Sequence, residues 1–404
     1  MTDRKSGGWL TIIVIYLFTI LSMATVGVVA SLTQDVALVL AVPQARVGLA
    51  IAMFSAPSAL LAALSGGIID RFGARRVMIF SAVSCAAGDA AALLAGSITI
   101  FNIALLLSGL GFMGIIVAAP ALIVNTMRGE RRVKAMSLWS TYAPTGFAAG
   151  LLLAAPFAGS PLWFMPMILH GLLMTALAGV GLLLPAVEPS PQSTASLKRR
   201  LTDFLEVFGQ APVLRLGIAV ALPSAISYGV SLVAPSYLAR THHVPIGESS
   251  ATVAMAKAVA MIACGLVMGQ VLSRKASPLI LFALLAAVGT AAQFTIFFPG
   301  SGFAVASGGL IVWLFAFGGA SAVGMALLPS VIKDPTRSGA ASGVVGQMTS
   351  IAAFLSPAIY FGMKVWTGYV LVCGAGMLIS LLALPVWFRR STMPASVHTT
   401  PDQV

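Results

Sequence analysis

Long apolar runs separated by short polar connections make up most of this sequence. A helix needs about twenty consecutive apolar residues to cross the hydrocarbon core of a bilayer, whereas a membrane-spanning strand needs only about ten. The runs are of helix length, and a helix satisfies its own backbone hydrogen bonds in lipid. We therefore predict an all-α integral membrane protein with twelve transmembrane helices, at residues 9–33, 47–69, 77–96, 101–125, 135–157, 162–186, 212–238, 248–272, 278–298, 303–331, 339–363 and 367–388.

The composition excludes several other classes of protein. Of the 404 residues, 59% are hydrophobic and only 8% are charged, and a soluble domain of this length would need a more highly charged surface. The net charge of +12 does not indicate nucleic acid as a partner, because the basic residues are dispersed between the apolar runs. Cys85, Cys264 and Cys373 lie within apolar runs and indicate neither disulfides nor a metal site. We find no nucleotide-binding loop or catalytic triad, and expect neither enzymatic activity nor a cofactor.

The lysine and arginine residues indicate how the chain crosses the membrane. Of the 23, nineteen fall on the termini and one set of alternate loops or at the span ends beside them, three fall on the other set, and only Lys257 lies deep within a span. Because cytoplasmic loops carry an excess of Lys and Arg, we expect both termini in the cytoplasm. We predict a multi-pass protein of a bacterial inner (plasma) membrane, organised as an amino-terminal six-helix bundle (1–187), a cytoplasmic central loop (188–210), a carboxy-terminal six-helix bundle (211–390) and a disordered cytoplasmic tail (391–404).

The loop after the second span has the sequence GGIIDRFGARR at residues 66–76. Its glycines allow a tight turn and a close approach of helices, and its arginines mark a cytoplasmic loop. The pattern Gly-x-x-x-Asp-Arg-x-Gly-x-Arg-Arg resembles the loop between helices two and three of the major facilitator superfamily of secondary transporters. A second copy, GQVLSRK at residues 269–275, follows the eighth span and has Ser273 in place of the acid. The candidate residues of a conformational gate are Gly66, Asp70, Arg71, Gly73, Arg75, Arg76, Gly269 and Arg274.

This resemblance implies two pseudo-symmetric six-helix bundles that alternate in exposing one central site. It also implies that helices two, five, eight and eleven form the interface between the bundles, and that Asp70 docks at the start of the eleventh helix when the cytoplasmic side is shut. Small residues recur at steps of four on these helices, as Gly146 and Gly150 do on the fifth, and such residues let helices approach closely in lipid. We expect a monomer in the lipid bilayer that moves a small-molecule substrate.

Lys257 is the strongest candidate for a substrate-binding residue. It lies about ten residues into the eighth span, which places it roughly 15 Å deep at a rise of about 1.5 Å per residue. It shares one helix face with Met261, Gly265 and Gly269, and we expect this face to point towards protein or the central cavity. A fixed cation there would attract an anionic, carboxylate-type substrate. The alternatives are a structural ion pair and a side chain that reaches the membrane surface.

Three further ionisable residues are candidates for proton coupling: Asp35, Asp89 and His170. A carboxylate and an imidazole are natural proton carriers, and ionisable groups within membranes usually have a partner or a function. Asp89 and His170 also suit a structural polar contact within the amino-terminal bundle, and Asp35 suits a helix end that meets water. Uncharged candidates for substrate binding lie on helices that the resemblance places around the cavity: Tyr16, Asn125, Tyr142, Tyr228, Trp313 and Gln347.

The sequence therefore predicts a secondary active transporter that works by alternating access, with a small organic anion as substrate and symport with a proton. Leu105 stands four residues before Gly109, where many proton-coupled exporters of the superfamily have an arginine, and this disfavours an exporter. The alternative substrate class is an amphipathic, drug-like or siderophore-like compound moved by proton antiport. A non-transporting membrane receptor or scaffold is the alternative from a different class of protein.

Overall fold

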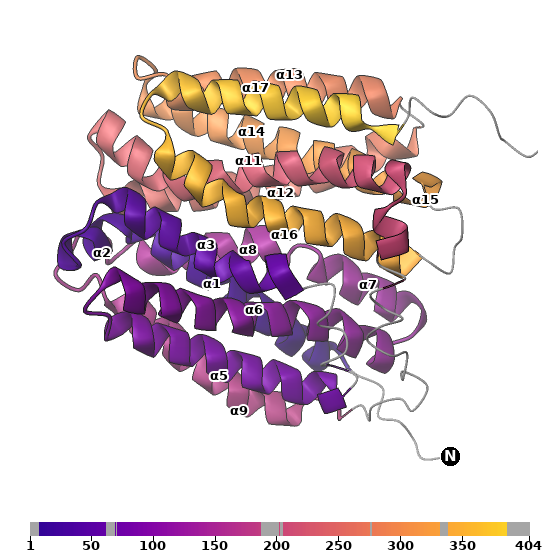
Figure 1. Ribbon diagram of the computed structural model, residues 1–404, viewed down its shortest axis with the longest axis horizontal. Coiled ribbons are helices and arrows are strands. Elements are labelled where there is room, and N and C mark those ends of the chain that lie inside the picture. The colour runs from indigo at the N-terminus through magenta and orange to yellow at the C-terminus, as the bar shows by residue number, and fades with distance from the viewer. Residues whose placement is uncertain are drawn as a thin grey trace, which may run out of the picture.

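The computed structural model describes residues 8–61, 69, 71–186, 202, 205–274, 277–331 and 338–385, and this part of the chain is all-α. The helices form two halves that lie one above the other (Figure 1). The amino-terminal half contains α1 (Trp9–Ser31), α2 (Thr33–Val39), α3 (Gln44–Leu61), α5 (Ala74–Leu93), α6 (Ile98–Thr126), α7 (Gly129–Trp139), α8 (Tyr142–Ala154), α9 (Met165–Val180) and the 3-10 helix η1 (Gly181–Leu183). The carboxy-terminal half contains α11 (Ala211–His242), α12 (Ile246–Ser273), α13 (Pro278–Phe297), α14 (Phe303–Ala326), α15 (Leu328–Val331), α16 (Ser338–Gly362) and α17 (Trp366–Ala383).

Within the described residues, eleven helices are long and apolar enough to cross a membrane, and α8 is a shorter apolar helix. The predicted continuous fifth span at 135–157 is therefore wrong in detail, because the chain turns at Ser140 and Thr141 between α7 and α8. Pro144 has no N–H to donate to the carbonyl four residues before it, so the helical hydrogen-bond ladder is interrupted there. The hydroxyls of Ser140 and Thr141 donate to the carbonyls of Ser137 and Leu138 at this turn.

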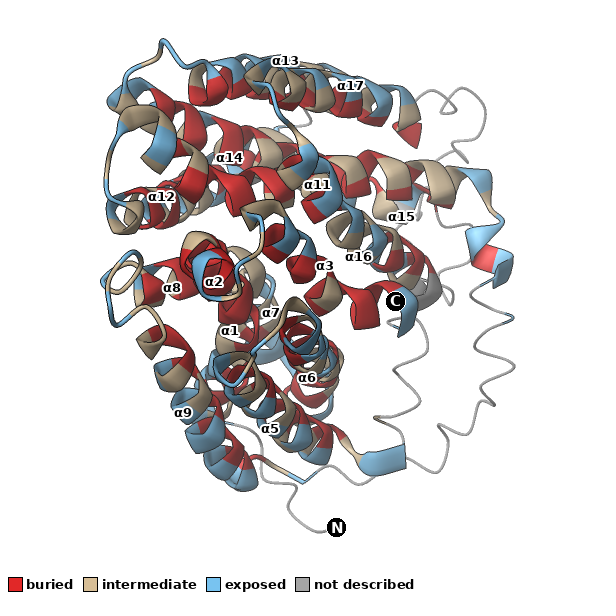
Figure 2. Cartoon of the chain, turned by 60° about the vertical axis from the view of Figure 1, so that its left-hand side comes forward, coloured by how far each residue is buried: buried red, intermediate tan, exposed pale blue. Residues whose placement is uncertain are grey.

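Two pairs of helices make most of the contact between the halves. α3 packs against α16, and α8 packs against α12. These are the second, eleventh, fifth and eighth of the expected spans, which is the arrangement that the resemblance implied. Buried residues are concentrated along these central helices, whereas the outward faces of the peripheral helices are exposed apolar surface suited to lipid (Figure 2).

The glycine pattern of the fifth span serves a different contact from the one predicted. A Cβ atom at Gly146 would overlap the carbonyl oxygen of Ile20, and one at Gly150 would overlap that of Ala24. Both glycines therefore allow α8 to lie against α1 within the amino-terminal half, not against the other half. A Cβ at Gly265 of α12 would have no neighbour within 4 Å, so this glycine does not mediate a close contact either. The small-residue pattern on α8 therefore did not identify the helix that its glycines contact.

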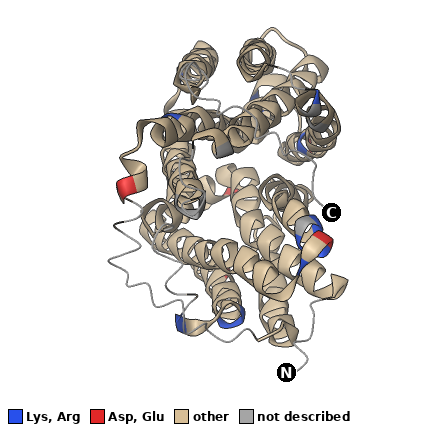
Figure 3. Cartoon of the chain, turned by 90° about the vertical axis from the view of Figure 1, so that its right-hand side faces the viewer, with Lys and Arg blue, Asp and Glu red and all other residues tan. Residues whose placement is uncertain are grey.

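Basic residues gather at the end of the molecule where α1 begins and α17 ends, which we call the basic end (Figure 3). Arg71, Arg75 and Arg76 lie where α5 begins, Arg215 lies near the start of α11, and Arg274 follows α12. The other end, which we call the opposite end, bears Arg46, Arg240 and Lys364 among the described residues. The free Cys85, Cys264 and Cys373 are buried between helices.

At the opposite end the two halves touch directly. Ser31 of α1 donates from its hydroxyl to that of Ser250 of α12 at 2.9 Å, and both residues are buried. A Cβ at Gly247 would overlap the carbonyl oxygen of Ala155, which shows how closely α12 approaches the end of α8. Nearer the basic end, Gly343 and Gly346 of α16 have no atom within 4 Å of the Cβ position. The described contacts between the halves therefore include a close seal at the opposite end.

Candidate functional site

Lys257 lies in the middle of α12, eleven residues after the helix begins at Ile246, which is roughly 16 Å along the helix axis at about 1.5 Å per residue. Its Nζ atom is 4.7 Å from the centroid of the Phe147 ring of α8, in the opposite half. The described part of the chain places no carboxylate within ion-pairing distance of this ammonium. Lys257 is thus a mid-depth cation at the interface whose observed contact is a cation–π contact.

Hydroxyl groups gather where α1, α8 and α12 meet, one helical turn from Lys257. The Tyr16 hydroxyl is 2.6 Å from Oγ1 of Thr141 and 3.2 Å from Oγ1 of Thr145. The Thr145 hydroxyl in turn lies 3.8 Å from the sulfur of Met261, which follows Lys257 by one helical turn. A cation and several hydroxyls from three helices therefore converge on one region between the halves.

Aromatic side chains extend this region within the amino-terminal half. The Tyr142 ring stacks on Trp139 with centroids 5.4 Å apart, and lies 6.3 Å from the Phe112 ring of α6. The centroids of the Phe112 ring and the Phe54 ring of α3 are 4.9 Å apart. Apolar faces beside a few hydrogen-bonding groups are typical of a site for a small organic molecule.

Two other predicted residues link the halves where α3 meets α11 and α16. The Tyr228 hydroxyl of α11 is 3.5 Å from that of Ser55 of α3. The side-chain amide of Gln347, on α16, donates to the carbonyl of Ser58 at 3.4 Å and also to that of Ala59. Both residues lie at the interface, but their observed role is to cross-link helices.

Asn125 and Trp313 do not join the site. Asn125 is exposed in the last turn of α6, near the basic end, where its amide donates to the carbonyl of Ala121. Trp313 is fully buried, with its ring against Gly289 of α13, because the missing side chain of that glycine leaves room for the indole. In this structure Trp313 belongs to the core of the carboxy-terminal half.

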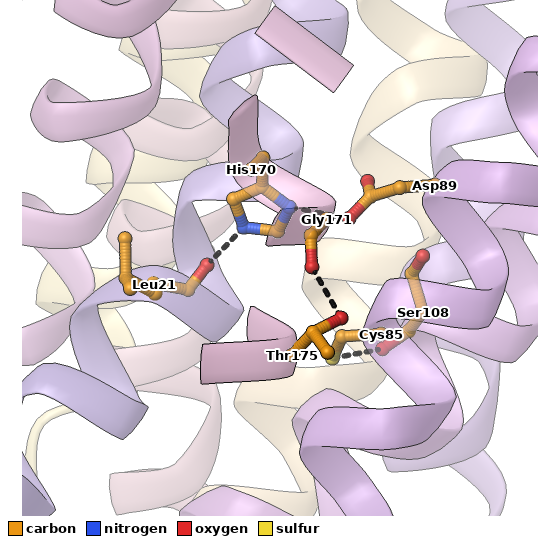
Figure 4. Close-up of polar contacts among 7 residues, drawn as sticks. All are labelled: Leu21, Cys85, Asp89, Ser108, His170, Gly171 and Thr175. Atoms are coloured by element: carbon orange, nitrogen blue, oxygen red, sulfur yellow. Dashed lines mark hydrogen bonds and ion pairs between the residues drawn. The ribbon is translucent and has the colours of Figure 1, made fainter. Parts of the chain in front are cut away.

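The candidate proton-coupling residues lie outside the Lys257 region. His170 of α9 places Nδ1 2.7 Å from Oδ2 of Asp89 on α5, and Nε2 2.7 Å from the carbonyl oxygen of Leu21 on α1 (Figure 4). Asp35 of α2 accepts the backbone N–H of Gly159 at 3.2 Å. Burial raises the pKa of the Asp35 carboxyl, and the Gly159 N–H offsets part of this effect. These contacts connect elements within the amino-terminal half.

Part of the predicted gate can be placed. Gly66 and Asp70 lie outside the described residues. Gly73 precedes α5 with φ of 81°, a left-handed backbone that favours glycine and permits the turn into this helix. Arg75 donates to the carbonyl of Leu184 at 3.3 Å and thereby ties the start of α5 to the end of η1.

The remaining gate residues lie at the basic end. Arg71 and Arg76 are exposed on either side of the turn that precedes α5. In the second copy of the loop, Gly269 lies in the last turn of α12 and the exposed Arg274 follows the helix directly. The two copies therefore occupy equivalent places in the two halves, each after a helix of the interface.

Three residues of the site were missed from the sequence: Phe147, Thr141 and Thr145. The two threonines are four residues apart and therefore share one face of a helix. This spacing, on a span expected at the interface, was a usable signal. The contact of Phe147 with Lys257 had no signal, because a phenylalanine within an apolar run looks like any other lipid-facing or core residue.

The arrangement of two apolar helix bundles around a polar interfacial site defines the chain as a multi-pass membrane transporter. The model of the Major Facilitator Superfamily matches residues 12–357, and the chain belongs to this superfamily. A search of curated proteins found no significant match.

Solved structures of transporters resemble the fold at low sequence identity. The nucleoside transporter NupG matches with a TM-score of 0.74 and 14% identity, over 94% of this chain and 100% of that one. A mutant of the peptide transporter POT matches with a TM-score of 0.75 and 12% identity, over 94% of each chain. A bacterial homolog of the human lysosomal transporter Spinster, inward-facing and occupied, matches with a TM-score of 0.70 and 14% identity, over 96% of each chain. These similarities establish the fold and leave the substrate of this chain open.

Proposed function

We propose that this transporter moves a small organic anion of the carboxylate type, by symport with a proton, across a bacterial inner membrane. The observation that carries the proposal is the Lys257 ammonium, which lies at mid-depth between the halves without a carboxylate partner among the described residues. In this proposal both termini face the cytoplasm, the protein is a monomer, and the basic end is the cytoplasmic end.

The energetics of Lys257 favour an anionic ligand. A cation–π contact contributes about 0.5–2 kcal/mol, which is small beside the cost of removing an ammonium from water. A bound carboxylate would supply the missing opposite charge, and a hydrogen bond to a charged group contributes about 1.5–3 kcal/mol. The hydroxyls of Tyr16 and Thr145 can turn to donate to the same carboxylate or to another oxygen of the substrate, whereas that of Thr141 donates to the Leu138 carbonyl.

The contacts between the halves support alternating access with the opposite end closed in this conformation. The opposite end is held by the Ser31–Ser250 hydrogen bond and by the close approach of Gly247 to Ala155. A solute bound at Lys257 would leave by that end only after these contacts separate. The two copies of the gate loop lie at the basic end and would control the other exit.

The rival substrate class is an amphipathic compound moved by antiport. Phe147, Met261 and the aromatic rings of Tyr142 and Phe112 give the site apolar walls that suit such a compound. A lipophilic cation would also need an acid in the site, and the described acidic residues lie elsewhere. The apolar walls therefore favour an organic anion with a hydrophobic body.

The experiment is uptake of labelled solutes into proteoliposomes with and without an imposed pH gradient. The panel contains lactate, benzoate, a nucleoside and a lipophilic cation, and the matched control is Lys364→Ala, which removes an exposed lysine from a loop at the opposite end. We expect carboxylate uptake that a proton gradient increases, and that Lys364→Ala preserves. Uptake of the lipophilic cation but of neither carboxylate would contradict the proposal, and the absence of flux for every solute would favour a receptor or scaffold.

A further inference from the structure

A buried acid and a buried histidine form a closed polar cluster between α1, α5 and α9. The His170 side chain is 1% exposed and that of Asp89 is 8% exposed. Nδ1 of His170 lies 2.7 Å from Oδ2 of Asp89, which is hydrogen-bond distance. Figure 4 shows the imidazole between the Asp89 carboxylate on one side and the Leu21 carbonyl on the other. Lys257 and its hydroxyl neighbours take no part in this cluster.

The hydrogen bonds determine how many protons the cluster holds. The Leu21 carbonyl oxygen can only accept, so Nε2 of His170 must carry a hydrogen. A neutral imidazole then has only a lone pair at Nδ1, yet this atom lies 2.7 Å from a carboxylate oxygen, which also has only lone pairs when ionised. A second hydrogen must lie between Nδ1 and Oδ2, as imidazolium with carboxylate or as imidazole with carboxylic acid. In either form the pair carries one removable proton and has no net charge.

The surroundings make the loss of this proton depend on conformation. Among the described residues, the titratable neighbour of the pair is the thiol of Cys85, one turn earlier on α5, and this thiol donates to the backbone carbonyl of Ser108 on α6. No described lysine or arginine approaches the pair, so release of the proton would leave a net negative charge without a counter-ion in a buried site. The proton is therefore held until the helices around the pair admit water.

The position of the pair favours exchange with one side of the membrane. Because α5 ends at Leu93, Asp89 lies four residues, or roughly 6 Å, from the end of the helix. His170 lies five residues after the start of α9. Here α5 ends and α9 begins, at the opposite end of the molecule, which the proposed topology places outside the cell. Protons from that side have about one helical turn to cross.

Helix α1 connects this pair to the Lys257 region. His170 bonds to Leu21 on α1, and the adjacent Ile20 carbonyl lies against Gly146 of α8. Tyr16, five residues before Leu21 on α1, forms hydrogen bonds with Thr141 and Thr145 at the start of α8. Because α8 also carries the Phe147 ring that contacts the Lys257 ammonium, a shift of α1 changes both regions at once.

We propose that the Asp89–His170 pair is the proton-binding site to which transport is coupled. The pair changes from neutral to a net charge of −1 as it releases one proton to water, and returns to neutral when it takes one up. The inference rests on the proposed proton symport and identifies its carrier. The competing interpretation is that the pair only fastens α5 and α9 to α1.

Asp89→Asn separates these two roles. The asparagine amide can donate to Nδ1 of a neutral His170 while Nε2 still donates to the Leu21 carbonyl. The hydrogen bonds that join α5, α9 and α1 are therefore kept without the removable proton. We expect normal exchange of labelled benzoate against unlabelled benzoate, and complete loss of the accumulation driven by a pH gradient. Accumulation by Asp89→Asn at the wild-type level would overturn the proposal. Glu130→Gln, which alters an exposed carboxylate of the same half, is the matched control and should accumulate normally.

A second measurement does not depend on transport. Acid–base titration of the purified protein in detergent should show one bound proton fewer in Asp89→Asn than in wild type, and equal titration curves would overturn the assignment. If Asp89→Asn fails to fold, the double substitution Asp89→Leu with His170→Leu serves instead, because buried ion pairs can often be replaced by apolar residues without loss of stability. It should retain exchange and lose accumulation, and retained accumulation would count against the pair.

Failure of this inference differs from failure of the proposed function. Wild-type protein that exchanges benzoate but never responds to a pH gradient would refute the pair as coupling site and leave the Lys257 site intact. Wild-type protein that exchanges no carboxylate would refute the proposed substrate class. The proton titration would still show in that case whether the pair binds its proton.

Discussion

The two halves of this transporter hold their membrane-buried charge in opposite ways. In the amino-terminal half, His170 bonds to both Asp89 and the Leu21 carbonyl, and the group is closed on every side by helices. In the carboxy-terminal half, Lys257 reaches across the interface to the face of Phe147 and has no carboxylate partner among the described residues. A satisfied pair can store a proton and fasten helices, whereas an unsatisfied cation is free to bind a ligand of opposite charge.

The largest expected effect comes from removal of the unpaired charge. Lys257→Ala should leave the fold intact and abolish carboxylate uptake, because the loss of a charged hydrogen bond of about 1.5–3 kcal/mol weakens binding by roughly ten- to over a hundredfold. Lys257→Arg should retain at most part of the affinity, since guanidinium is larger and planar. Binding assays in detergent would measure both. Wild-type affinity in Lys257→Ala would show that the two halves do not differ as described.

The second effect concerns how tightly α1, which joins the two regions, is held. Gly150→Ala should place a methyl group against the Ala24 carbonyl and destabilise the α1–α8 contact, and overpacking of this kind costs about 1–3 kcal/mol. Gly265→Ala on α12 is the matched control, because its new methyl group would have no neighbour within 4 Å. Thermal unfolding in detergent should show a lower midpoint for Gly150→Ala alone. Equal midpoints would argue against a close α1–α8 contact.

A smaller effect is expected from the hydroxyl cluster. Tyr16→Phe removes the group that lies 2.6 Å from Thr141, and a neutral hydrogen bond contributes about 0.5–1.5 kcal/mol. We expect carboxylate affinity to fall by roughly two- to thirteenfold, well short of the effect at Lys257. Titration calorimetry with benzoate would measure it. A larger loss than for Lys257→Ala would mean that hydroxyls, not the ammonium, provide most of the binding.

The smallest effect is a pH dependence at Asp35. Burial raises the pKa of this carboxyl above its ordinary value of 3.8, so the folded protein binds the proton more tightly than the unfolded chain does. Stability from this group is therefore present at low pH and is lost as the pH rises through the window between the ordinary and the raised pKa. Asp35→Asn should flatten the dependence of the unfolding midpoint on pH within that window. An unchanged slope in the variant would exclude this contribution.

Much of the architecture was predictable because bilayer thickness imposes a length on each apolar run. The interface pairs were also predictable, but only through the family resemblance. The break between α7 and α8 could have been inferred from Pro144, whereas the packing of Gly146 and Gly150 on α1 could not, because a small-residue pattern does not identify its partner helix. The burial of Trp313 likewise depends on Gly289 of another helix.

The candidate site was predictable only at residues whose charge makes their placement in a membrane costly in free energy. Lys257, Asp89 and His170 stand out in a sequence because charge and apolar surroundings conflict. Their partners do not stand out, because the match of Asp89 with His170 and of Lys257 with Phe147 is created by helices that meet only in the folded chain. The sequence therefore identified the charged residues, and the structure distinguished the paired from the unpaired.

The central claim is that the unpaired ammonium of Lys257 selects an anionic substrate. The most direct test compares the affinity of benzoate with that of benzamide, its uncharged amide, in wild type and in Lys257→Gln. We predict that wild type prefers the carboxylate by at least about tenfold, as expected for a charged hydrogen bond, and that the preference disappears in the variant. An equal affinity for both compounds in wild type, or a preference that survives in Lys257→Gln, would contradict the account.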